Sequence, residues 1–405
     1  PLGGITPLLL FRMRFIPFLP FSPARVAIMA MFFCSGFVYA IWGVHVPVIK
    51  ARFHFSDGEL SLALFAVAGG AILAMGPLGR WIVRVGSAKA CLWGGLLLAA
   101  CVAPLLLVPS PLLLFPLLLA FGAANSLYDI AINAQASLLE RQFARPLMSS
   151  LHGLFSLGGL CGSLVGSAWQ GGGLPSWLLF VLSAGGVAAV TLAGRPHCLP
   201  ELVAAADEAH GAGVRRQLLA LGGLAFIGLV AEGGMYDWSS VYMGEGVQPG
   251  PGWVGLGYAG FSLGMTLGRF FGDRVRTRRG STRTLQWSGI LVLAGIAAAL
   301  AFPLAVPAVA GFTLVGLGCA NCVPVLMSRA ATLPGVAAAE ALALVGRLAY
   351  LGLLLGPVLI GFTADRAGLA AGIALIGAGG LVIFLCTRRV LGLPEGQGAP
   401  AGGRG

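Results

Sequence analysis

The sequence is poor in charge, because only 10% of its 405 residues are Asp, Glu, Lys or Arg, whereas an average soluble domain has about 25%. A soluble fold of this length needs many more polar side chains to cover its surface. Apolar residues fill the gap and make up 58% of the chain. Lipid is therefore the expected solvent for most of the chain, which excludes an ordinary soluble domain.

Motifs for ATP binding and for zinc-dependent hydrolysis are also lacking, since neither G-x-x-x-x-G-K-[ST] nor H-E-x-x-H occurs. The 8 cysteines are scattered through apolar segments with no disulfide or zinc spacing. We therefore predict that the protein is not an enzyme and holds no metal or other cofactor. The net charge of +11 is divided among the links between apolar segments, so it indicates membrane orientation and not nucleic-acid binding.

Twelve apolar segments are each long enough to cross a hydrocarbon core of about 30 Å. They lie at 26–48, 60–83, 88–109, 112–139, 148–170, 175–194, 217–243, 252–275, 284–304, 306–331, 338–364 and 369–387. Because lipid offers no partner to the backbone, segments of this kind form helices. The predicted fold is an all-α membrane protein with 12 transmembrane helices.

The longest hydrophilic interruption separates these spans into two sets of six. The expected organisation is a cytoplasmic lead-in, an N-terminal six-helix half, a cytoplasmic linker, a C-terminal six-helix half and a flexible tail, at residues 1–25, 26–194, 195–216, 217–390 and 391–405.

The distribution of basic residues predicts the orientation. Only Lys50, Arg52 and Arg366 fall in links after odd-numbered spans, and Arg269 and Arg347 fall within spans. The other basic residues lie at the two termini or at the links after even-numbered spans. The positive-inside rule therefore places both termini and the central linker in the cytoplasm.

The two sets of spans are similar to each other. The segments 79–89 and 273–283 occupy the same place in each half, and five of their positions match in type, Gly86 with Gly280 and Ser87 with Ser281 among them. "FGAAN" at 121–125 likewise matches "LGCAN" at 317–321. Duplicated halves are typical of transporters that bind their solute near the membrane midplane, where the halves meet.

These loops resemble the loop after span 2 in the major facilitator superfamily. In the first half Gly79, Arg84 and Gly86 fit that loop, while Val83 replaces its acidic residue. In the second half Arg278 and Gly280 fit, preceded by Asp273 and Arg274. The acidic residue helps to latch the cytoplasmic side in the superfamily, so the resemblance implies either that this latch is missing here or that Asp273 supplies it from one turn earlier.

Longer segments are similar to one bacterial branch of the superfamily, the MosC-like, rhizopine-associated permeases. They are "RPLMSSLHGLFSLGGLCGSL" (145–164), "EGGMYDWSSVYM" (232–243), "GYAGFSLGMTLGRFFGDR" (257–274) and "LAYLGLLLGPVLIGFTAD" (348–365). The resemblance covers about 26–390 and implies solute transport by alternating access in a bacterial inner membrane.

Only three of the 14 acidic residues lie well inside spans, namely Asp129, Glu232 and Asp237. An ionisable group at this depth costs about 2.5–3.5 kcal/mol even on the mildest scale, so it is expected to face a cavity or the bundle interior. We predict that Glu232 binds solute or accepts a proton. Asp129 and Asp237 are predicted to act in coupling or gating, although helix pairing explains a membrane carboxylate equally well.

Polar and aromatic side chains share faces with these acids. Asn125, Asp129 and Asn133 are spaced four apart, within an arc of roughly 80° of one helix, and Asn321 corresponds to Asn125 in the second half. The predicted solute contacts are Tyr39, Trp42, Asn125, Glu232, Tyr236 and Asn321. His45 is a further gating candidate, and Trp238 fits an aromatic at the membrane interface.

The sequence thus favours a secondary transporter of a small polar solute such as a sugar, polyol or amino-polyol, with proton coupling as a possibility. Export of amphipathic compounds is the alternative within the same fold, and a sensor or scaffold that does not transport is a more distant one. The cluster of arginines at 274–283 is expected to contact anionic lipid head groups, and the protein is expected to be a monomer.

Overall fold

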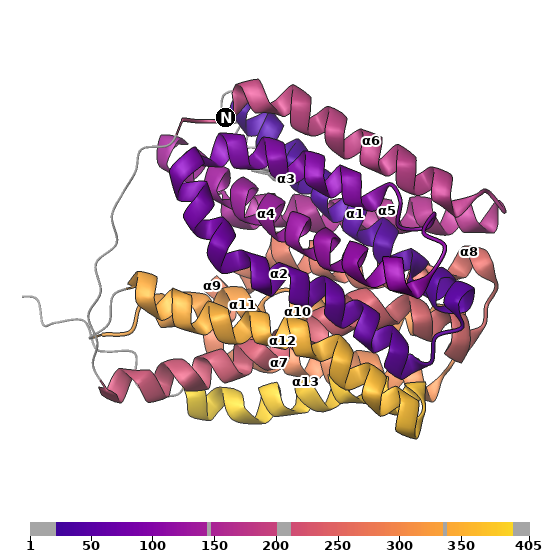
Figure 1. Cartoon of the computed structure of the whole chain (residues 1–405). Helices are drawn as coiled ribbons and strands as arrows, with labels where there is room; N and C mark the ends of the chain where they lie inside the picture. Colours follow the sequence, from indigo (N-terminus) through magenta and orange to yellow (C-terminus); the bar gives the residue numbers. More distant parts are fainter. Residues whose placement is uncertain (1–21, 144–146, 201–211, 335–337, 392–405) are drawn as a thin grey trace, which may run out of the picture.

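The computed structural model describes residues 22–143, 147–200, 212–334 and 338–391, and all regular structure in these ranges is helical (Figure 1). The predicted lead-in and tail lie almost entirely outside this part of the chain, as does the middle of the predicted linker.

The N-terminal half consists of six long helices. They are α1 (Pro23–Phe53), α2 (Asp57–Val85), α3 (Ser87–Val102), α4 (Pro111–Phe143), α5 (Met148–Gly171) and α6 (Ser176–Gly194), followed by the short η1 (Arg195–His197).

The C-terminal half contains helices at the corresponding places. They are α7 (Ala212–Tyr242), the π-helical turn η2 (Met243–Val247), α8 (Pro251–Val254), α9 (Leu256–Ala301), α10 (Ala305–Cys319), α11 (Cys322–Ala331), α12 (Ala338–Ala367) and α13 (Leu369–Leu391).

The twelve predicted spans are present, with three differences in how they are built. The third span ends early, at Val102, and is followed by a turn that contains Pro104. The eighth and ninth spans form one continuous element, α9, which is bent at Gly280. The tenth span is broken into α10 and α11 by Ala320 and Asn321. Ten segments in the described part are long and apolar enough to cross a membrane, and α3 and the first part of α9 supply the other two spans.

The predicted repeat reappears in the backbone. Gly86 joins α2 to α3 with φ 85° and ψ 147°, and Gly280 bends α9 with φ 77° and ψ 161°. A side chain is strongly disfavoured in this region of backbone space, so glycine is required at both places. The two halves therefore turn their second span into the third with the same conformation.

Close glycine contacts are repeated as well. In α5, Gly158 packs against the carbonyl oxygen of Phe33 in α1, leaving no room for a Cβ. The matching Gly352 in α12 packs in the same way against the carbonyl oxygen of Phe226 in α7. Small residues allow membrane helices to approach backbone to backbone, and the duplicated sequence uses this packing in both halves.

The two halves lie side by side with their helices running in the same general direction (Figure 1). Three helix pairs form most of the boundary between them: α2 with α12, α5 with α9, and α1 with α7. We name the two ends of the bundle by what they carry. The terminal end, at the left of Figure 1, carries the start of α1 and the end of α13, and the opposite end is called the Lys50 end.

Hydrogen bonds join the halves at the Lys50 end. The Lys50 Nζ lies 2.6 Å from Asp57 Oδ1 in its own half and 2.7 Å from Glu245 Oε1 in the other. The Gly58 N–H donates to Asp365 Oδ1 at 3.3 Å. These contacts hold the two halves together at this end of the bundle.

We expect Lys50→Gln to weaken this closure. The variant leaves Glu245 and Asp57 without their shared cation, and a partly exposed pair of this kind is worth about 0–1 kcal/mol. The population open at the Lys50 end should therefore rise by up to about fivefold. Spin labels at the exposed Ala51 and Ala367, one in each half, measure the change as a shift toward longer distances.

Arg52→Gln is the matched control, because Arg52 donates to the carbonyl oxygens of Leu106 and Val108 within its own half. It removes the same charge at the same end and should leave the label distances unchanged. Equal distance distributions in wild type and Lys50→Gln would show that the Lys50 cluster does not hold the halves together.

Candidate functional site

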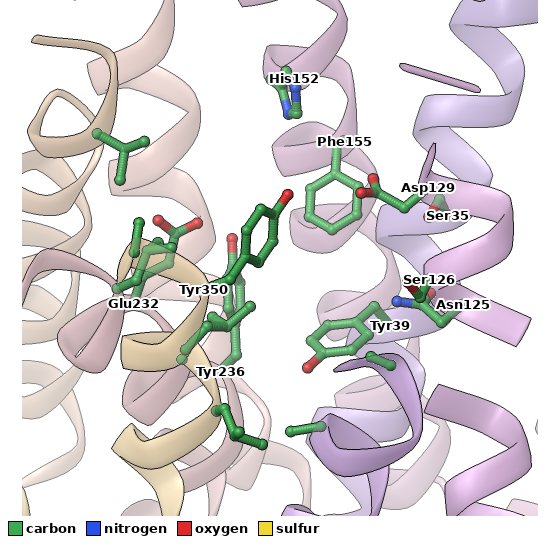
Figure 2. Close-up of a pocket in the computed structure, with 18 of the residues that line it drawn as sticks. Ser35, Tyr39, Asn125, Ser126, Asp129, His152, Phe155, Glu232, Tyr236 and Tyr350 are labelled. Carbon is green, nitrogen blue, oxygen red and sulfur yellow. The ribbon is translucent and has the colours of Figure 1, made fainter. Parts of the chain in front are cut away.

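A cavity of about 520 Å³ lies between the two halves. Figure 2 shows one wall from the N-terminal half, which carries Asn125 and Asp129, and an opposite wall, which carries Glu232. The polar and aromatic groups that line it come from both halves and include Ser35, Tyr39, Trp42, Asn125, Ser126, Asp129, His152, Glu232, Tyr236, Asp237, Arg269, Asn321 and Tyr350. All six predicted solute contacts are among these residues.

The polar stripe of α4 divides into a cavity-facing part and a structural part. Asn125 and Asp129 line the cavity. Asn133 does not, and its Nδ2 donates to Asp129 Oδ1 at 3.0 Å and to the Asp129 carbonyl oxygen at 2.9 Å. Asn133 therefore orients the Asp129 carboxylate from one turn along the same helix without neutralising its charge.

Glu232 is paired with Arg269, which lies in the first part of α9. The Arg269 Nη2 is 3.1 Å from Glu232 Oε1. The other nitrogen, Nη1, donates to Ser156 Oγ at 2.8 Å and to the His152 carbonyl oxygen at 3.3 Å, both on α5. One guanidinium thus compensates a carboxylate of its own half and binds the other half at the same time.

Aromatic rings fill the space between the walls. Tyr39 and Tyr236 meet edge to face with ring centroids 5.9 Å apart, and Trp42 packs against Phe121 at 5.7 Å. The Trp42 Nε1 and Asp237 Oδ1 are buried and have no hydrogen-bond partner within the described part of the chain. Buried polar groups of this kind normally have a partner, so these atoms are available to a solute.

Asn321 lies where the tenth span breaks. It is the residue before α11, and its side-chain amide packs against Gly272 of α9 while the residue also lines the cavity. A broken span exposes backbone polar groups, and such breaks are tolerated where they line a cavity. Its counterpart Asn125 lies in the unbroken α4, so the sequence repeat is not matched by identical local geometry.

Other predicted residues lie away from the cavity. His45 is fully buried between α1 and α6, with its Nδ1 2.8 Å from the Ile41 carbonyl oxygen and its ring against Phe180. Trp238 is not an interfacial aromatic as predicted: it is fully buried and donates to the Pro357 carbonyl oxygen. A helix partner, and not the membrane interface, satisfies its indole N–H.

The loop motif is separate from the cavity. Gly86 and Gly280 form the two turns described above, and Arg84, Arg274 and Arg278 are exposed. The side chain of Asp273, the predicted latch residue, lies outside the part that the structure describes, and so do the surroundings of Gly79.

Arg269 and Tyr350 are among the cavity residues that sequence reasoning did not single out. Arg269 was noted only as a basic residue inside a span, although a charge at that depth needs a partner and Glu232 was the available acid. Tyr350, from α12, lies between the two walls in Figure 2. No polar residues at helical spacing accompany Tyr350 in the sequence, so nothing distinguishes it from an aromatic residue that only packs.

Known proteins resemble the chain in sequence and in fold. No protein-family model matches it. An uncharacterised MFS-type transporter of Yersinia pestis is 33% identical over 85% of this chain and 90% of its own length. Membrane protein MosC of Rhizobium meliloti is 32% identical over 88% of each chain.

Solved structures agree on the fold. The nucleoside transporter NupG superposes with a TM-score of 0.73 at 12% identity, over 91% of this chain and 99% of its own. A bacterial homologue of the human lysosomal transporter Spinster, in an inward-facing and unoccupied conformation, gives 0.66 at 15% identity, over 93% and 98%.

The relatives and structural neighbours are transporters and not enzymes, and the two six-helix halves around a central cavity agree with a multi-pass membrane transporter. With relatives more than 30% identical over most of its length, the chain belongs to the major facilitator superfamily.

We predict that Arg269→Met lowers the melting temperature of the purified protein in detergent, because it leaves Glu232 buried and unpaired. Loss of one partner of a buried polar pair costs about 1–3 kcal/mol. Adding Glu232→Gln to Arg269→Met should restore most of the loss, since the unpaired charge is then gone. Arg347→Met, at an exposed arginine of α12, serves as the control. A double variant no more stable than Arg269→Met would contradict the pairing.

Proposed function

We propose that the chain is a secondary transporter that moves a small polar solute across a bacterial inner membrane by alternating access. The observation that carries this proposal is the cavity between the halves, where both halves present polar atoms that have no protein partner. A volume of about 520 Å³ falls within the range of about 300–1,000 Å³ typical of small-molecule sites.

The contacts between the halves support alternating access. In this structure they are hydrogen-bonded at the Lys50 end, and the cavity lining continues from Asp237 past the middle to Met148 and Met327 in the terminal half. With the orientation from basic residues, the termini lie in the cytoplasm and this state opens inward. The exposed arginines of 274–279 then meet anionic lipid head groups. A monomer suffices, because one chain encloses the cavity.

Glu232 and Asp129 are the proposed coupling groups. Glu232 is tied through Arg269 to Ser156 in the other half, so a proton on Glu232 would release the guanidinium and weaken a contact between the halves. Asp129 lines the cavity and has no cationic partner among the described residues. It can therefore exchange a proton with water in the cavity. His45 and Asp237 remain gating candidates.

Export of amphipathic compounds is the second candidate, favoured by the aliphatic and methionine side chains among the lining residues, such as Ile72, Leu229 and Met327. Flexible methionines accommodate varied apolar ligands. The lining also carries three carboxylates and three tyrosine hydroxyl groups, and these polar groups favour the polar solute.

Solute binding and coupling are tested in sequence. A thermal-shift screen against sugars, polyols, amino-polyols and lipophilic cations should show stabilisation by polar compounds at concentrations above their Kd, since the shift follows RT ln(1 + [L]/Kd). Uptake of the best ligand into proteoliposomes should then be faster with an imposed pH gradient than without it.

Glu232→Gln should remove the response to the gradient while leaving facilitated uptake. Glu59→Gln, which removes the same charge at an exposed residue outside the cavity lining, should retain the response. Gradient-driven uptake that is unchanged in Glu232→Gln would exclude Glu232 as the coupling group. Stabilisation by lipophilic cations alone would favour the exporter.

A further inference from the structure

The charges around the cavity do not balance. Its lining includes three carboxylates, those of Asp129, Glu232 and Asp237. Arg269 is the only Lys or Arg among the described lining residues, and it is paired with Glu232 at 3.1 Å. Two carboxylates are therefore left without a cationic partner in the described part of the protein, in a setting where an uncompensated charge is costly.

Asp129 is the better placed of these two to meet a ligand. It is half-buried and lines the cavity, and its side chain points toward the opposite wall in Figure 2. Its hydrogen bond in the structure comes from Asn133, a neutral amide of the same helix. Asp237 is only 6% exposed, and one of its oxygens is enclosed without a partner.

Aromatic rings surround the space in front of Asp129. Phe155 of α5 and Tyr350 of α12, from the other half, line the same cavity as Asp129, and in the view of Figure 2 their rings lie between Asp129 and the opposite wall. Ring faces attract an organic cation, most strongly when water is excluded. Tyr39 and Asn125 from the N-terminal half and Tyr350 from the C-terminal half add hydroxyl and amide groups to the cavity, and these suit the hydroxyl groups of a polar solute.

We infer that the solute is a hydroxylated organic amine whose ammonium group binds Asp129 between Phe155 and Tyr350. This inference rests on the proposed function and narrows it from polar solutes in general to cationic ones. The carboxylate supplies charge recognition, the rings exclude water from around the nitrogen, and the amide and hydroxyl groups bind the rest of the molecule. A neutral polyol of the same size leaves Asp129 without a counter-charge and binds less tightly.

Matched pairs of compounds test the inference. Binding to the purified full-length protein is measured by thermal shift for glucosamine against glucose and for 1-amino-1-deoxysorbitol against sorbitol. N-acetylglucosamine, whose nitrogen is a neutral amide, is the uncharged counterpart of glucosamine. A charge-assisted hydrogen bond predicts at least about tenfold tighter binding of the amine in at least one pair. Asp129→Asn should abolish the preference, because asparagine keeps the shape and loses the charge.

Asp129→Glu is the companion variant that keeps the charge, and it should retain a preference for the amine. Asp237→Asn is the matched control at the second unpaired carboxylate, and it should leave the preference in place. Loss of the preference in Asp237→Asn but not in Asp129→Asn would overturn the placement at Asp129.

The failure of this inference is distinct from the failure of the proposed function. Equal binding of amine and neutral compound in wild type would overturn the inference, and would indicate that Asp129 carries a proton while polar-solute transport still stands. Stabilisation by none of the sugars, polyols or amines, with apolar cations active in the same assay, would remove the polar-solute proposal and this inference together.

Discussion

The cost of a charge in hydrocarbon governs the interior of this protein. Glu232 and Arg269 are tolerated because they neutralise each other at 3.1 Å, and because the remaining guanidinium nitrogen reaches Ser156 and the His152 carbonyl oxygen across the boundary between the halves. The same requirement that makes the pair necessary therefore joins the two halves at the level of the cavity. A change in the charge of either group alters both the site and the contact.

Around this centre, the duplicated halves provide rigid walls. Glycines at repeat-equivalent positions bring α5 onto α1 and α12 onto α7 with backbone contact, so each half can move as a packed unit. The connection between the halves includes polar contacts. At the Lys50 end it includes a cation shared between Asp57 and Glu245 and a backbone N–H on Asp365, interactions that water can replace when this end opens.

Much of the fold follows from the sequence, because lipid imposes simple rules. Apolar length located the spans, and the matched loops around Gly86 and Gly280 indicated the duplication that the backbone repeats. The bent α9 and the break at Asn321 were not predicted, because an interruption within an apolar run depends on packing against neighbours such as Gly272.

Site residues could be predicted where a polar side chain lies unusually deep within an apolar span. Asp129, Glu232 and Asn125 were found in this way, and all of them line the cavity. Position along a helix does not reveal which way a side chain points, so the sequence could not show that His45, the gating candidate of α1, packs against Phe180 outside the cavity lining. The partner of Glu232 was also missed, because the approach of α9 to α7 and α5 is a tertiary contact that no spacing in the sequence encodes.

The central claim is that one cavity is exposed in turn to the two sides of the membrane. Ser126 lines this cavity and its hydroxyl has no protein partner, so Ser126→Cys, in a chain whose native cysteines are replaced, gives a small reporter. The measurement is its rate of reaction with a membrane-impermeant thiol reagent in right-side-out and inside-out vesicles. Reaction from both sides, faster from the terminal end and shifted toward the other side by Lys50→Gln, is the predicted result. Reaction from one side only, with and without Lys50→Gln, would contradict alternating access.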